Sequence, residues 1–147
     1  MVSLLDVNVL VALAWPNHVH HEAAHRWCRQ EAAAGWATCP VTQSGFVRVS
    51  SNRRVLPDAR SPREAIELLR AMIALPRHVF WTDEIAIASS PLIAASRLVA
   101  HHQITDAHLL GVALGHGGRL ATFERAVSDL LPAGHPGDRV EVIRAGA

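Results

Sequence analysis

Lysine is missing from this sequence, and all 14 of its basic residues are arginines. This absence excludes every mechanism that needs a lysine, such as a P-loop lysine, a Schiff base or a lysine at a phosphoryl site. The 13 acidic residues leave a formal net charge of only +1. Overall charge therefore does not indicate nucleic-acid binding, and any basic surface has to be local.

Cysteine is also scarce. The two cysteines, Cys28 and Cys39, do not have the spacing of a metal-binding motif. We expect each to be a free, partly buried thiol, which suits the reducing conditions of the cytoplasm.

Long hydrophobic runs are absent as well. The apolar start, residues 1–15, lacks both a basic segment and a cleavage site, and Asp6 and Asn8 interrupt it. The apolar stretch 91–100 carries Arg97. These patterns predict neither a signal peptide nor a membrane span, so we expect a cytoplasmic protein without a membrane partner.

What the sequence does contain is an alternation of short apolar runs and helical patterns. Half of the 147 residues are hydrophobic, which suits a single domain over residues 1–147. Buried strands are predicted at 2–5, 36–39, 78–81, 119–122 and 140–143. Helices are predicted at 8–15, 21–34, 40–50, 61–75 and 104–116, with a further short helix starting at Ser90. The alternation predicts an α/β fold in which helices cover a parallel sheet.

Several helix ends carry local signals. Ser61 can cap the helix that follows, with Pro62 in the first turn and Glu64 closing a capping box. Gly35 and Gly117 stand where helices are expected to end.

Three acidic residues lie at the ends of predicted elements. Asp6 directly follows the first strand, Glu124 lies two residues beyond the fourth, and Asp106 is in the first turn of the helix over 104–116. In open α/β sheets, ligands bind beyond the carboxyl ends of the strands. We therefore expect these three acids, far apart in sequence, to converge at one sheet edge.

Converging carboxylates repel one another, and a divalent cation relieves that repulsion. A site with oxygen ligands and no histidine or cysteine favours Mg²⁺ or Mn²⁺ over Zn²⁺. Such a metal polarises a phosphate and lowers the pKa of bound water. The three acids thus predict a magnesium-dependent phosphodiester hydrolase.

Each acid also has an ordinary interpretation when it is considered alone. Asp6 could be no more than a cap of the following helix. Asp106 could be no more than an acid that stabilises the helix dipole behind a Thr105 cap, and Glu124 could be an ordinary surface residue. Only the three together, at matching strand and helix ends, indicate a metal site.

The sequence resembles the PIN-domain family, and within it the VapC toxins of bacterial toxin–antitoxin pairs. Four segments carry the resemblance, in order and over nearly the whole chain: Leu5-Asp6-Val7-Asn8-Val9-Leu10, Thr42-Gln43-Ser44-Gly45-Phe46-Val47-Arg48-Val49, Ile104-Thr105-Asp106-Ala107-His108-Leu109 and Leu120-Ala121-Thr122-Phe123-Glu124-Arg125.

The resemblance implies a three-layer α/β/α sandwich around a central parallel sheet. It also implies a homodimeric, Mg²⁺-dependent endoribonuclease that cleaves RNA and is inhibited by a cognate VapB-like antitoxin. Asp6 and Asp106 would be the main metal ligands and Glu124 would complete the site. Asn8 and Thr105 would support it through hydrogen bonds.

Two positions depart from the family pattern. Gln43 stands where the second motif usually has an acid, and Glu124 stands where Asp is more common. An amide can position water or offer one weak oxygen, but it brings no charge. We therefore expect one tight metal site and a weak second one, with Asp83 and Glu84 as reserve candidates for a missing ligand. The alternative is a catalytically weakened PIN domain that binds RNA or antitoxin without cutting.

Other residues carry weaker indications. Arg48, Arg53 and Arg54 flank the loop after the second motif and could guide RNA to the acids, although a solvated or antitoxin-binding surface is the alternative. His21 and His25 share a helix face, but no third ligand supports a zinc site, and a solvated face is favoured. The four tryptophans are expected in the core or at an interface.

The position of Asp6 after the first strand also brings two other classes of protein into consideration. A phosphatase of the haloacid dehalogenase type needs a second acid where this chain has Asn8, and it uses a lysine. A receiver domain needs the same lysine. The missing lysine makes both poor fits.

Overall fold

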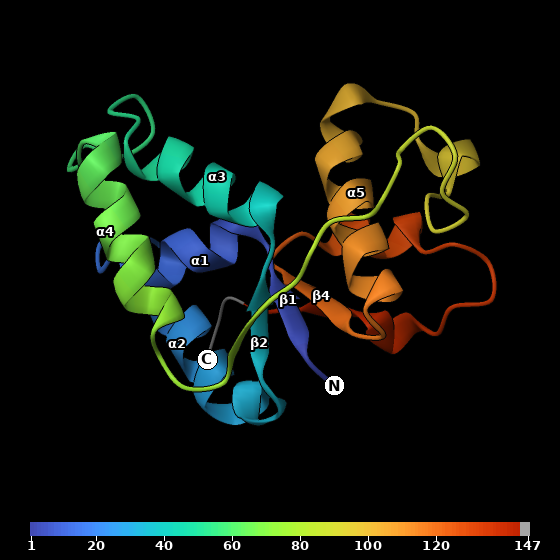
Figure 1. Ribbon diagram of the computed structural model, residues 1–147, viewed down its shortest axis with the longest axis horizontal. Helices are drawn as coiled ribbons and strands as arrows, with labels where there is room; N and C mark the ends of the chain where they lie inside the picture. The colour runs from blue at the N-terminus through green and yellow to red at the C-terminus, as the bar shows by residue number, and fades with distance from the viewer. Residues whose placement is uncertain (145–147) are drawn as a thin grey trace.

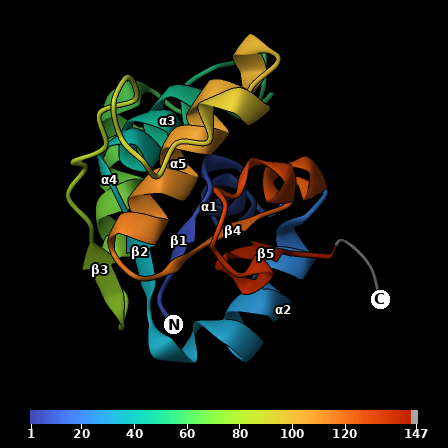
Figure 2. The same ribbon diagram turned by 90° about the vertical axis from the view of Figure 1, so that its right-hand side faces the viewer.

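A five-stranded sheet forms the centre of the molecule. The computed structural model describes residues 1–144. The strands are β1 (Ser3–Leu5), β2 (Trp36–Thr38), β3 (His78–Phe80), β4 (Arg119–Thr122) and β5 (Val140–Val142). They are all parallel and lie in the order β3-β2-β1-β4-β5 (Figures 1 and 2). The five predicted strands and their parallel arrangement are confirmed.

Within residues 1–144, five α-helices cover the sheet, and their bounds agree closely with the prediction. They are α1 (Val7–Ala14), α2 (His21–Glu31), α3 (Pro40–Ser50), α4 (Pro62–Ile73) and α5 (Ile104–Gly115). The predicted capping box at the start of α4 is present, since Glu64 N donates to Ser61 Oγ and Ser61 N donates to Glu64 Oε1. After α2 the chain forms a 3₁₀ turn over Ala32–Ala34. The helical structure ends at Gly35, whose φ of 113° favours glycine.

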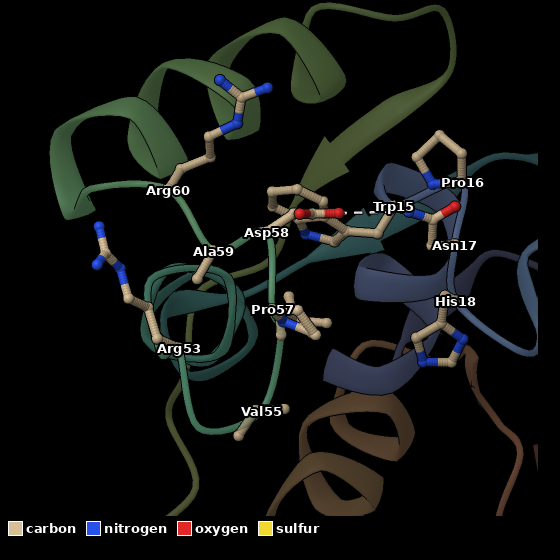
Figure 3. A pocket seen from close by; sticks show the side chains of 11 residues that line it. Trp15, Pro16, Asn17, His18, Arg53, Val55, Pro57, Asp58, Ala59 and Arg60 are labelled. Atoms are coloured by element: carbon tan, nitrogen blue, oxygen red, sulfur yellow. Dashed lines mark hydrogen bonds between the residues drawn. The ribbon is translucent and has the colours of Figure 1, made fainter.

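The loop between α3 and α4 folds back beside the end of α1. Figure 3 shows Val55, Pro57 and Asp58 of this loop opposite the segment Trp15 to His18, while the side chains of Arg53 and Arg60 extend outward from the loop. A cavity of about 750 Å³ lies between the two segments.

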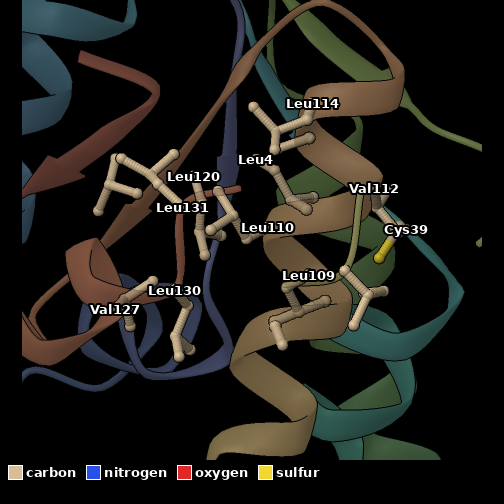
Figure 4. Packing of buried hydrophobic residues seen from close by; sticks show 14 of the residues in the cluster. Leu4, Cys39, Leu109, Leu110, Val112, Leu114, Leu120, Val127, Leu130 and Leu131 are labelled. Carbon is tan, nitrogen blue, oxygen red and sulfur yellow. The ribbon is translucent and has the colours of Figure 1, made fainter. Parts of the chain in front are cut away.

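The two faces of the sheet are covered by different helices, as alternation along each strand requires. Leu4 and Leu120 pack in one buried cluster with α5 residues such as Leu109 and Leu110 (Figure 4). The neighbouring Leu5 belongs to a second cluster, in which the helices on the opposite face contribute Leu10, Trp27, Phe46 and Leu69. The three-layer α/β/α sandwich is therefore confirmed.

The short helix predicted from Ser90 is wrong. Residues 87–93 form turns, and the nearest regular structure is a 3₁₀ helix over Ala95–Arg97. Ser90 Oγ accepts a hydrogen bond from Leu92 N, so it caps a single turn. Ile85 and Ile93 lie over Gly111 of α5, and this packing holds the segment in an irregular path despite its helix-like composition.

Gly118 lies just before β4, in close contact with the Trp81 ring and the backbone of Val2. A Cβ built there would lie 2.4 Å from the Trp81 ring and 2.5 Å from the backbone oxygen of Val2. We expect Gly118→Ala to lower the free energy of unfolding by about 2 kcal/mol or more, because a backbone atom cannot move aside cheaply. Urea unfolding of the variant and the unmodified protein measures this difference in the free energy of unfolding. Gly115→Ala is the matched control, since its Cβ would make ordinary contact with Leu92 at 3.5 Å, and equal losses in both variants would contradict the steric explanation.

Candidate active site

Asp6 is held rigidly at the carboxyl end of β1. Its side chain caps α1, with Oδ1 accepting a hydrogen bond from Val7 N at 2.7 Å. Its other oxygen, Oδ2, accepts from Thr122 Oγ1 at 2.8 Å. The residue is only 6% exposed. Asp6 is thus a helix cap, as its ordinary interpretation proposed, but capping uses one oxygen and leaves the other turned toward β4.

Thr122 links two of the three acids. It is fully buried at the end of β4, donates to Asp6 and accepts a hydrogen bond from the backbone N–H of Glu124 at 3.1 Å. The sequence prediction gave Thr122 no role although it lies in the fourth motif. The signal was available only once β1 was known to pair with β4. The register joins Leu4 to Leu120 and Leu5 to Ala121, so the next residues, Asp6 and Thr122, face each other.

Asp106 approaches the same edge from the first turn of α5. Burial, followed by the negative charges of Asp6 and Glu124, raises the pKa of Asp106 to about 6 against the opposing effect of His102. The pKa of Asp6 is also raised, chiefly by burial and additionally by Glu124, against the hydrogen bonds from Thr122 and Val7. The structure therefore brings the three predicted acids into electrostatic contact.

No basic side chain within residues 1–144 forms an ion pair with any of these three acids. In the same part of the chain, no three histidine, cysteine or acidic side chains stand close enough to enclose a metal. Like charges without a cation between them are expected to stand apart, and Glu124 is exposed. The donor set fits a hard divalent ion, since all three side chains are carboxylates, and burial together with neighbouring negative charge raises the pKa values of Asp6 and Asp106.

The predicted supporting residues lie near the acids in sequence but not in a hydrogen-bond network. Asn8 in α1 and Thr105 in α5 are both exposed. In the part of the chain that the structure describes, neither side chain makes a hydrogen bond to protein. Both are therefore available to solvent or to a ligand.

Gln43 is turned toward β2 and β3. Its Nε2 donates to Thr38 Oγ1 at 3.0 Å, and that hydroxyl lies 2.7 Å from His78 Nε2. Burial lowers the pKa of His78, which favours the neutral form of the ring beside this hydroxyl. Thr38 alternates with Ala37, which packs toward α5, so the amide is bound on the face opposite α5.

The reserve candidates have other surroundings. Asp83 Oδ2 lies 2.7 Å from His108 Nε2, and Asp83 Oδ1 accepts from Ile85 N. Glu84 is exposed. Asp83 therefore connects the segment after β3 to His108 of α5.

The histidine pair on α2 caps another helix. His21 Nδ1 lies 2.7 Å from Ala12 O, and His25 Nε2 lies 2.9 Å from Leu13 O, the last carbonyls of α1. Each ring donates to one of them, which satisfies groups that the helix itself leaves unpaired. This contact accounts for the spacing of the two histidines.

The predicted arginines are all exposed around the end of α3. Arg53 lines the cavity beside Trp15 and His18, whereas Arg48 and Arg54 do not (Figure 3).

The prediction for cysteine agrees with the structure, and so does that for three of the four tryptophans. Trp27, Trp36 and Trp81 are buried, whereas Trp15 is half-buried and lines the cavity. Cys39 is buried and Cys28 is half-buried, and both are free. None of the helices in residues 1–144 is long and apolar enough to cross a bilayer.

Several known proteins are similar in sequence to this chain. The sequence model of the PIN domain matches residues 3–130. Ribonuclease VapC39 of Mycobacterium tuberculosis is 47% identical over 134 residues, which cover 91% of this chain and 96% of that protein. Ribonuclease VapC38 of the same species is 46% identical over 131 residues, covering 88% and 89%.

A solved structure supports the fold independently. The crystal structure of Mycobacterium tuberculosis VapC20, described as a sarcin-ricin loop cleaving toxin, superposes with a TM-score of 0.63 over 93% of this chain and 98% of that one, at 15% identity. At that identity the likeness concerns the fold alone. Together with the family match and the two VapC ribonucleases, it establishes that the chain belongs to the PIN domain family and resembles its VapC-like members.

Proposed function

We propose that this protein is a VapC-like toxin, a Mg²⁺-dependent endoribonuclease that hydrolyses RNA phosphodiester bonds. The observation that carries the proposal is the convergence of Asp6, Asp106 and Glu124. Besides burial, the negative charge of Glu124 raises the pKa of Asp6, and the charges of Asp6 and Glu124 raise the pKa of Asp106. No basic side chain within residues 1–144 forms an ion pair with these acids. The names of the relatives, which are ribonucleases, support RNA as the substrate.

Asp6 and Asp106 would hold the metal, and Glu124 would complete the site directly or through water. A bound Mg²⁺ or Mn²⁺ would polarise the scissile phosphate and lower the pKa of the attacking water. Thr122 keeps one oxygen of Asp6 in place and also anchors the backbone of Glu124. Thr122 thus fixes the Asp6 carboxylate relative to the backbone of Glu124.

The partners follow from the resemblance to VapC proteins. We propose a cognate VapB-like antitoxin as the inhibitor, a homodimer as the active assembly and the cytoplasm as the place of action. Size-exclusion chromatography with light scattering tests the dimer directly.

Cleavage of total RNA tests the proposed activity. Purified protein, free of antitoxin, is incubated with RNA with and without Mg²⁺ or Mn²⁺. We expect discrete fragments that need the metal, and a loss of roughly a hundredfold or more in Asp6→Asn, which keeps the shape of the side chain but removes its charge. Asp138→Asn, an exposed acid on a remote turn, is the matched control. Metal-independent cleavage, or full activity in Asp6→Asn, would overturn the proposal.

The second candidate function is a PIN domain that binds RNA or antitoxin without cutting. Gln43 favours it, because an amide bound to Thr38 replaces the acid usual in the second motif. Intact RNA under every metal condition, from a folded protein that still retains RNA, would support this alternative.

Metal stoichiometry follows from the same substitution. With three acids in place of four, we expect isothermal titration of the free protein with Mn²⁺ to show one tight ion and a weak second one. Gln43→Glu supplies the missing charge and should strengthen the second binding step. Two equally tight ions in the unmodified protein would contradict this expectation.

A further inference from the structure

The cavity between the end of α1 and the loop after α3 has the size and lining of a nucleotide-binding site. Its volume of about 750 Å³ falls in the range of small-ligand sites. It is lined by two aromatic rings, Trp15 and His18, and by two arginines, Arg53 and Arg60. Arginine forks onto phosphate, and aromatic faces stack on bases.

Hydrogen bonds hold the two aromatic rings of this cavity, Trp15 and His18, in position. Trp15 Nε1 donates to the buried hydroxyl of Ser50 at 3.1 Å, which fixes the indole ring. His18 Nδ1 accepts from the backbone N–H of His20 at 3.0 Å. Burial, with His20 and His21 nearby, lowers the pKa of His18, so its ring is a neutral planar surface. Both rings are therefore available for stacking without a large ordering cost.

The loop opposite is held by its own hydrogen bonds. Leu56 N donates to Asn52 O, Arg54 N donates to Asn52 Oδ1, and Arg60 N donates to Ser50 O. These bonds keep the two arginine positions on the rim of the cavity. A preformed rim binds a ligand more tightly than one that must be ordered first.

Charge on the lining favours an anion. Within residues 1–144, Arg53 forms no ion pair, and Arg60 makes only a solvent-exposed contact of 3.6 Å with Glu64. Asp58 is the acidic residue among the described lining residues, and its Oδ2 accepts a hydrogen bond from Asn17 Nδ2 at 3.3 Å. The two guanidinium groups therefore leave the cavity with a positive balance.

A row of rings connects this cavity to the acids. The ring of His18 lies 5.7 Å from that of His20, which lies 4.5 Å from that of Phe123. Phe123 directly precedes Glu124. A single strand that reaches the carboxylates at one end of this row can therefore extend along it to the cavity at the other.

We propose that the cavity is a subsite for a nucleotide of the substrate RNA strand that lies beyond the nucleotides joined by the cleaved bond. Arg53 and Arg60 bind its phosphate, and Trp15 and His18 pack against its base. The inference rests on the proposed ribonuclease function, and it adds a substrate subsite remote from the acids.

Binding of single-stranded RNA tests the subsite. The probe is a short fluorescein-labelled oligoribonucleotide of mixed sequence, added to full-length Asp106→Asn protein so that it is not cut. We expect Arg53→Ala with Arg60→Ala to weaken binding about tenfold or more at low salt. The slope of log affinity against log salt should fall by about 1.4, the value for two lost phosphate contacts on a single strand.

The matched control is Arg70→Ala. Like Arg60, Arg70 is an exposed arginine paired with a glutamate on α4, but it does not line the cavity. It should leave both affinity and slope nearly unchanged. His18→Ala should weaken binding about fivefold or more with an unchanged slope, and His18→Phe should restore it, because only the ring is needed for stacking.

The outcomes separate the subsite from the nuclease. If the unmodified protein cleaves RNA while the double arginine variant binds RNA as well as Arg70→Ala does, the subsite is wrong and the nuclease stands; the cavity then belongs to a protein partner. If the unmodified protein neither binds nor cleaves RNA, both proposals fail. If free mononucleotides compete as well as the oligonucleotide, the cavity binds a soluble nucleotide and the subsite is again overturned.

Discussion

Asp106→Asn is expected to make the metal-free protein more stable at neutral pH while it removes Mg²⁺-dependent cleavage. The pKa of Asp106 in the folded protein, about 6, lies above its ordinary value of 3.8. When folding raises the pKa of a carboxyl group, its charged form has a higher free energy in the folded state than in the unfolded state. At pH values above the folded pKa, that group therefore lowers the free energy of unfolding. Asparagine removes that charge together with its repulsion from Asp6 and Glu124.

The expected gain at pH 7 is about 1 kcal/mol, since the shift has to be discounted for the solvent that reaches this half-buried side chain. The gain should shrink as pH falls from about 6 toward 4, where Asp106 of the unmodified protein becomes protonated in both states. Urea unfolding at several pH values without metal measures it.

Added Mg²⁺ should reverse the order of stability. The ion binds the folded form of the unmodified protein and stabilises it, by about 2.7 kcal/mol at a hundredfold excess over the dissociation constant. Asp106→Asn should respond weakly, because a neutral amide replaces a ligand. If the variant gains as much stability from Mg²⁺ as the unmodified protein does, Asp106 is not a metal ligand.

Thr122→Val is expected to damage the site although it removes no acid. Valine keeps the shape of threonine but leaves Asp6 Oδ2 and the N–H of Glu124 without their shared partner. Losing hydrogen bonds at a fully buried position costs about 1–3 kcal/mol of folding free energy. Because the hydroxyl also holds Asp6 in place, we expect Mn²⁺ affinity to fall about tenfold or more.

Thr122→Ser separates these effects from packing. Serine keeps the hydroxyl and loses one methyl group, so it should restore most of the Mn²⁺ affinity while remaining somewhat less stable. Isothermal titration and urea unfolding of the same three proteins provide both measurements. Equal Mn²⁺ affinity in Thr122→Val and the unmodified protein would show that Asp6 does not depend on this contact.

The sequence by itself determined the element order and the residues at the ends of elements. Local rules were sufficient, because a cap or a strand end depends on near neighbours: Ser61 and Glu64 are three residues apart, and both bonds of their capping box form as predicted. Asp6 after β1 and Asp106 in the first turn of α5 were located in the same way. The helix expected from Ser90 failed because Ile85 and Ile93 pack onto α5, a contact with a distant element.

Only the tertiary structure decided which residues meet. Thr122 and Asp6 are 116 positions apart, and their hydrogen bond exists because β4 lies beside β1 in one particular register. Thr38, the hydrogen-bond partner of Gln43, meets His78 because β2 lies beside β3. The cavity forms where the loop after α3 meets the end of α1. Hydrophobic periodicity reports which face of an element is buried but not which element covers it, so strand order and loop path had to come from the folded chain.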